Sequence, residues 1–241
     1  MNDSLVSRLD EIRERLSLLE SNLPKRVDGW ALSQLSKLPF KVLVYREALS
    51  WRMAELSRAA FEEFEKARLA AAIILTRAAF ETSAALWYLC TKVEASVESA
   101  ELGDIDDYLM KMSMGMATDP PTDPATGEPI MPRPVRIGTF LNCVEKDIEG
   151  FSRQYGYLSE YAHPNWTGTV YLYLKFDQGN AAADLGQNIR QPENTKLIFA
   201  VSLSNALLIF ELSYNRITDI VPRFIKLCEN RLDNAAGMGA L

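Results

Sequence analysis

The chain has 241 residues, a formal net charge of −6 and an isoelectric point of about 5.0. This acidic balance argues against broad, non-specific binding of nucleic acid, which needs clustered lysine and arginine side chains to neutralise phosphates. Three widely spaced cysteines and one histidine do not supply the four close ligands of a structural zinc site, so we expect no metal and no other cofactor. We interpret Cys90, Cys143 and Cys228 as reduced core thiols of a cytoplasmic protein.

The first 24 residues predict an amphipathic helical arm. Apolar side chains recur in alternating steps of four and three residues, which is the heptad pattern of a packed helix, at Leu5, Leu9, Ile12, Leu16, Leu19 and Leu23. Pro24 follows and is expected to help end the helix. The stripe either docks on the chain's own bundle or pairs with a second subunit, so a homodimer or another protein partner is expected through this helix. The charged start has no continuous apolar stretch, and we expect no secretory signal.

Three further helices are expected at 30–37, 39–67 and 68–95, with a break near Lys66 and Ala67. The stretch 69–90 is long enough to span a membrane, and no comparable stretch precedes it. Arg77 and Glu81 lie near its middle, where a charge costs about 2.5–3.5 kcal/mol in a bilayer. We therefore predict a central, buried bundle helix and no membrane association.

A helix over 103–114 opens with three acids, Asp104, Asp106 and Asp107. A helix cap and first-turn acids explain this cluster better than a divalent metal does. Residues 117–136 hold six prolines and predict an irregular loop, either a lid or partner-binding loop or a disordered excursion. Thr139 is expected to cap a helix that runs to Gly150.

A second helix is predicted over 151–162, ended by His163 and Pro164 because proline disfavours helix in the residue before it. Residues 169–176 and 181–188 alternate in polarity and predict a hairpin around 178–180. A long helix over 195–232 follows, which Pro222 should kink or divide.

These elements predict a mainly α fold, a multi-helix bundle with long antiparallel helices and one small β-hairpin. We expect a single domain over 1–241. Its parts are an arm at 1–24, the bundle at 25–232, a proline-rich loop at 117–137, a hairpin insertion at 168–190 and a flexible tail at 233–241.

Two pairs of polar residues with helical spacing form the candidate catalytic set. Arg77 and Glu81 are four residues apart, and so are Ser159 and His163, so each pair shares one helix face. Charges inside so apolar a helix need partners. We therefore expect the two helices to face each other and the four residues to form one polar network.

This network has two interpretations. It is either a structural cluster that fixes helix register or a functional pocket. His163 is the only histidine and must carry any histidine-dependent acid–base step. An arginine to hold a phosphate and a histidine to move a proton suit a phosphate diester, and Tyr157, Asn165 and Trp166 are the expected binding residues. The motifs of dinucleotide-binding proteins, P-loop proteins, zinc proteases and GxSxG hydrolases do not occur.

The segments LTRAAFETSAALWYL and YLSEYAHPN resemble uncharacterised bacterial helical families with an Arg-x-x-x-Glu helix and a later Ser-x-x-x-His-Pro helix. These families are grouped with HEPN-type proteins, all-helical bundles of toxin and phage-defence systems, and the resemblance covers roughly residues 40–165. It implies a dimeric, metal-independent ribonuclease that uses an arginine and a histidine.

In the usual HEPN signature four to six residues separate the arginine from the histidine, and the corresponding positions here are Leu158, Tyr157 and Gly156. The nearest upstream arginine on that helix, Arg153, has nine residues between it and His163. The signature is absent, so Arg77 from another helix would have to supply the partner. The leading hypothesis is a HEPN-like phosphodiesterase directed at RNA or nucleotides, in phage defence or a toxin–antitoxin pair. The alternative is a non-enzymatic interaction or dimerisation module with a structural polar network.

Overall fold

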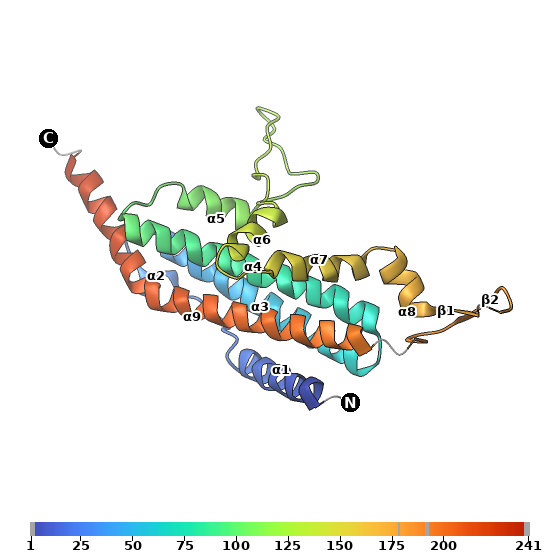
Figure 1. Ribbon diagram of the computed structural model, residues 1–241. Coiled ribbons are helices and arrows are strands. Elements are labelled where there is room, and N and C mark those ends of the chain that lie inside the picture. Colours follow the sequence, from blue (N-terminus) through green and yellow to red (C-terminus); the bar gives the residue numbers. More distant parts are fainter. Residues whose placement is uncertain (1–2, 178, 191–192, 239–241) are drawn as a thin grey trace.

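The computed structural model describes residues 3–177, 179–190 and 193–238 of the chain. Three long helices form its centre: α3 (Leu38–Glu65), α4 (Leu69–Ser99) and α9 (Glu193–Met238). They lie side by side in Figure 1, and α4 contacts α3, α9 and three shorter helices. The mainly α fold class with one small hairpin is confirmed.

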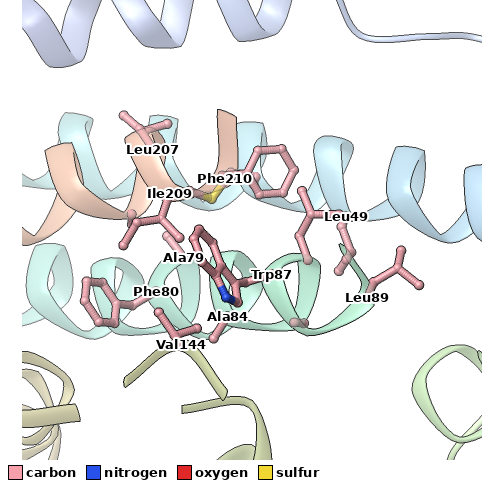
Figure 2. Packing of buried hydrophobic residues seen from close by; sticks show 14 of the residues in the cluster. Leu49, Ala79, Phe80, Ala84, Trp87, Leu89, Val144, Leu207, Ile209 and Phe210 are labelled. Atoms are coloured by element: carbon pink, nitrogen blue, oxygen red, sulfur yellow. The ribbon is translucent and has the colours of Figure 1, made fainter. Parts of the chain in front are cut away.

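Helix α4 occupies the centre of the bundle because it carries small and apolar side chains on most of its faces. Figure 2 shows its buried residues meeting those of α3, α6 (Ile137–Glu145) and α9. The break between α3 and α4 falls at Ala67, whose φ of 59° turns the chain back on itself. The labelled core residues come from all four helices: Leu49, Ala79, Phe80, Ala84, Trp87, Leu89, Val144, Leu207, Ile209 and Phe210.

Helix α1 (Asp3–Ser21) lies against α9 and α3. Its heptad stripe is buried there, with Leu5, Ile12 and Leu16 almost inaccessible to solvent. An ion pair between Arg58 and Glu20 (2.6 Å) ties the arm to α3. The stripe therefore packs on the chain's own bundle, and pairing with a second subunit stays a prediction.

Helix α2 (Gly29–Leu32) is shorter than the predicted 30–37. Asp28 caps its start by accepting from the backbone N–H groups of Trp30 and Ala31. The prediction was wrong at the other end because the Ser33 hydroxyl accepts from the N–H groups of Leu35 and Ser36. Such local side-chain bonds compete with helix.

Helix α5 (Ile105–Ser113) is shorter than the predicted 103–114, and Asp104 precedes it without a capping side-chain hydrogen bond, so the predicted cap was wrong. Its two first-turn acids make ion pairs, Asp106 with Lys41 (2.5 Å) and Asp107 with Lys111 (2.5 Å). The proline-rich loop then leaves the bundle (Figure 1) and closes on itself through a bridge between Thr122 and Pro129.

The predicted cap at Thr139 was wrong, because α6 begins at Ile137 and ends at Glu145. The Glu145 carboxylate accepts from the N–H groups of Gly150 (2.9 Å) and Ser152 (2.7 Å). These bonds lower the pKa of Glu145 and fix the start of α7 (Phe151–Ala162). Gly150, the last residue before α7, has a φ of 86°, a backbone conformation that glycine adopts readily.

The predicted strand 169–176 was wrong in its first half. Residues Trp166–Val170 form a π-helical turn, η1, and Tyr171–Tyr173 form α8. Strands β1 (Leu174–Asp177) and β2 (Ala182–Leu185) then pair antiparallel, with Leu174 opposite Leu185. Asn165 starts the helical turn by accepting from the N–H of Gly168, so a capping side chain overrides the strand-like alternation.

Helix α9 contains Pro222 without being divided there, and its last part turns away from the earlier axis in Figure 1. It also continues past the predicted end at 232, to Met238. The rest of the predicted tail, 239–241, lies outside the described residues.

Two helices are long and apolar enough to cross a membrane, Leu69–Ser99 and the Glu193–Arg231 part of α9. In their apolar windows 61% and 56% of the residues are buried inside the bundle. Core helices of soluble proteins have the same length and composition, so the two helices are weak evidence for a membrane span.

Candidate functional site

Arg77 and Glu81 on α4 meet the phenol of Tyr155 on α7. Arg77 donates to the Tyr155 hydroxyl from Nε (3.1 Å) and Nη2 (2.7 Å), and that hydroxyl donates to Oε1 of Glu81 (2.7 Å). Arg77 Nε also lies 3.4 Å from Glu81 Oε1. The three side chains thus form one closed set of hydrogen bonds between the two helices.

The packing of α7 on α4 brings Tyr155 close to Arg77 and Glu81. The rings of Phe80 and Phe151 stack with centroids 4.2 Å apart, and Trp87 donates to Asp147 before the start of α7. Later residues of α4 therefore face earlier residues of the α7 segment, so the two helices run antiparallel. This register brings Tyr155 opposite the turn of Arg77.

The polar set is half-buried, with 30% of the Arg77 side chain and 32% of the Glu81 side chain exposed. Burial raises the pKa of Tyr155, and the nearby Glu81 acts in the same direction while Arg77 opposes it. The phenol therefore stays protonated at neutral pH and can donate to Glu81.

Ser159 lies one turn after Tyr155 on α7. Its hydroxyl donates to the backbone carbonyl of Tyr155 (3.0 Å), within its own helix. Among the described residues no hydrogen bond joins Ser159 to Arg77 or Glu81. Hydrogen bonding therefore does not join the four predicted residues into one network.

His163 closes α7 in an extended conformation, and its backbone N–H donates to the carbonyl of Ser159 (3.2 Å). Its side chain is exposed. No hydrogen bond or ion pair of that side chain occurs within the described part of the chain. It lies eight positions after Tyr155, which is about 12 Å along a helix axis.

Two of the three predicted binding residues are open to solvent. Tyr157 and Trp166 each expose 54% of their surface, and the guanidinium of Arg190 lies 5.6 Å from the centre of the Trp166 ring. Asn165 is engaged instead, because it donates to Glu160 (2.7 Å) and accepts from the N–H of Gly168 (3.0 Å).

Gly168 holds this region in place through a close backbone approach. A Cβ atom at this position would lie 2.0 Å from the carbonyl oxygen of His163 and 2.7 Å from that of Tyr161. The π-helical turn therefore packs directly on the end of α7, and the conformation of His163 depends on glycine here.

Tyr155 belongs to the site but was not among the residues expected there from the sequence. Its spacing was the available signal, since Tyr155, Ser159 and His163 follow one another in steps of four. Within the described ranges no group of three or more His, Cys, Asp or Glu side chains could hold a metal ion.

The site offers a partly exposed guanidinium and a protonated phenol between α4 and α7, and an exposed imidazole at the end of α7. A guanidinium binds phosphate oxygens through paired N–H donors, and an imidazole exchanges protons near neutral pH. Comparison of the chain with protein-family models, with curated proteins and with solved structures gives no match.

Proposed function

We propose that the protein is a metal-independent phosphodiesterase directed at RNA or nucleotides. The proposal places its site on the α4–α7 strip, which we define as Arg77, Tyr155, Ser159 and His163. The observation that carries it is that Arg77, hydrogen-bonded to Tyr155 of α7, and His163, at the end of the same helix, are both accessible to solvent. The resemblance to HEPN-type proteins supports the same chemistry and a cytoplasmic role in phage defence or a toxin–antitoxin pair.

The chemistry needs an anion-binding group and a proton carrier. Arg77 would hold a phosphate oxygen of the substrate. His163 would accept the proton of an attacking ribose 2′-hydroxyl, which forms a bond to phosphorus while the bond to the leaving 5′-oxygen breaks. The imidazolium would then return the proton to the leaving oxygen.

The exposed aromatic residues fit a single-stranded substrate. Unstacked bases bind on aromatic rings with little dependence on sequence, and such a contact contributes about 1–3 kcal/mol per base. Tyr157 lies on α7, and Trp166 comes three residues after His163. The guanidinium of Arg190 beside Trp166 adds a positive charge. The chain's overall acidity then restricts binding to this local surface.

A second candidate is a non-enzymatic helical module in which Arg77, Glu81 and Tyr155 only lock α7 onto α4. The observation that favours it is the closed hydrogen-bond set, which leaves Ser159 and His163 outside. Under this candidate, the strip has no substrate and the protein acts through protein partners.

The test is cleavage of a labelled single-stranded RNA by the purified protein in the presence of a metal chelator. His163→Gln should reduce the cleavage rate at least about a hundredfold, the contribution expected of a general acid–base group. The exposed His163 has no side-chain partner within the described residues, so this variant should keep the stability of the wild type.

Arg153→Gln is the matched control, because Arg153 is an exposed cation on the same helix. Its loss removes a positive charge and should leave the cleavage rate within about twofold of wild type, since surface charges act weakly. An inactive wild-type protein, or full activity in folded His163→Gln, would refute the phosphodiesterase and leave the non-enzymatic module.

A further inference from the structure

A second polar centre lies in the middle of the bundle, away from the α4–α7 strip. Arg46 and Glu47 are neighbours on α3, and only 9% and 7% of their surfaces are exposed. Consecutive helix residues normally point in different directions. Here Arg46 folds back so that its Nε lies 2.7 Å from Oε1 of Glu47.

Contacts from α9 fix the Arg46 guanidinium. Its Nη1 donates to the hydroxyl of Thr218 (2.9 Å), and its Cζ lies 4.1 Å from the centre of the Tyr214 ring. A buried ion pair of this kind is weak evidence for stability, because apolar residues of similar volume often serve as well or better. The pair therefore invites a functional explanation.

The two oxygens of the Glu47 carboxylate are used unequally. Oε1 receives both Arg46 and the Tyr214 hydroxyl, at 2.7 Å and 3.1 Å. Within the described part of the chain, Oε2 accepts only from the same Tyr214 hydroxyl, at 3.3 Å. Because the single phenolic hydrogen of Tyr214 is shared between the two oxygens of Glu47, Oε2 can accept a further, stronger hydrogen bond.

Glu47 and Tyr214 line a cavity of about 360 Å³ between the end of α1, α3 and α9. We call this space the α1 cavity. Its size lies in the usual range for small-molecule sites, and its walls combine apolar side chains with polar and charged ones. The apolar walls come from α1, the segment after it and α9: Leu18, Leu19, Leu23, Pro24, Leu207 and Phe210.

Charged side chains line the α1 cavity, namely one arginine, Arg15, and two glutamates, Glu47 and Glu211. With Arg46, which pairs with Glu47 from outside this lining, these charges sum to zero, so the feature that favours a cation is the acceptor position on Oε2 of Glu47. Arg15 is already paired with Glu211 and with Glu11 on α1. Arg46 lies behind Glu47 and does not line the cavity, so the Glu47 carboxylate is the group presented to a ligand.

We propose that the α1 cavity binds a small organic ammonium ion, with its nitrogen at Oε2 of Glu47 and its apolar body among the leucines of α1. Phe210 and Tyr214 also line the cavity, and aromatic rings attract a nearby positive charge. Arg46 is a positioning residue that aims the carboxylate. This site is independent of the phosphodiesterase proposal, and neither depends on the other.

The experiment measures binding of phenethylammonium and of 3-phenylpropionate to the full chain by calorimetric titration. The two probes share an aromatic body and carry opposite charges at neutral pH. The wild type should bind the ammonium at least about tenfold more tightly than the carboxylate, a difference of about 1.4 kcal/mol. No ammonium binding, or equal affinity for the two probes, would overturn the proposal.

Two variants locate the site. Glu47→Gln should weaken ammonium binding at least about tenfold, and Leu19→Trp should abolish it by filling the cavity from the α1 side. Leu19→Trp changes no charge, so it remains informative where Glu47→Gln does not fold. Glu14→Gln is the matched control, because Glu14 is an exposed carboxylate on α1 that does not line the cavity. Unchanged affinity in Leu19→Trp, or an equal loss in Glu14→Gln, contradicts the site.

Discussion

Tyr155 on α7 donates its phenolic hydrogen to Glu81 on α4, and the two oxygens lie 2.7 Å apart. Arg77 donates to the same phenol from the other side, so the hydroxyl is both donor and acceptor at one point of the helix interface. This contact aligns α7 with α4 and thereby sets where Ser159 and His163 lie.

Tyr155→Phe should destabilise the protein by about 0.5–1.5 kcal/mol, the net contribution of a hydrogen-bonded group. The loss stays small because Arg77 and Glu81 are one-third exposed and can bind water instead. Urea denaturation followed by circular dichroism measures the change. A double-mutant cycle with Glu81→Gln should show coupling, whereas strictly additive effects would contradict a direct contact.

Glu47→Leu should destabilise the bundle by about 3–5 kcal/mol, because it leaves the buried Arg46 guanidinium without its counter-charge. Arg46→Met combined with Glu47→Leu should recover most of this loss, since both charges are then replaced by apolar volume. Thermal and urea denaturation of the three proteins test this. A double variant that is no more stable than Glu47→Leu would contradict the explanation that the unpaired Arg46 causes the loss.

Gly168→Ala should disturb the end of α7, because its Cβ would collide with the carbonyl oxygens of His163 and Tyr161. Gly156→Ala is the matched control on α7, where an added Cβ meets nothing within 4 Å. The control should be neutral or stabilise the helix by about 0.5–1 kcal/mol. Melting temperatures and amide chemical shifts near His163 report both changes, and equal behaviour of the two variants would contradict the close approach.

Alkaline pH should destabilise the fold through its buried thiols. Burial raises the pKa of Cys90 to about 12 and that of Cys228 to about 11, whereas an unfolded thiol ionises near 8.5. Above about pH 8.5 the unfolded state loses these protons first, so the free energy of unfolding should fall by up to about 1.4 kcal/mol per pH unit for each thiol.

The useful window is about pH 8.5–10, before the tyrosines of the unfolded chain ionise. Urea denaturation at several pH values measures the slope, and Cys90→Ala with Cys228→Ala should flatten it. Cys143 is only half-buried and serves as the control position. A slope that survives removal of both buried thiols would assign the effect to other groups.

Periodicity alone predicted the bundle, because helices bury one stripe and a central helix buries nearly all its sides. The heptad of α1 and the apolar run of α4 follow from local pattern, whereas nothing in the sequence forces the break at Ala67. Predictions failed where side chains capped the backbone: Ser33 shortened α2, and Asn165 turned the start of the expected strand into helix. Such bonds depend on a few polar atoms and leave little trace in polarity patterns.

Local spacing was enough to place Arg77 and Glu81 on one helix face, because residues four apart lie one turn from each other. Their partner Tyr155 could not be predicted in this way, since only the antiparallel register of α7 on α4 brings that phenol to them. The burial of Arg46 and Glu47 beside the α1 cavity likewise depends on how the helices pack. Neighbouring positions on a charged helix predict solvent exposure, and only the docking of α1 and α9 removes that pair from water.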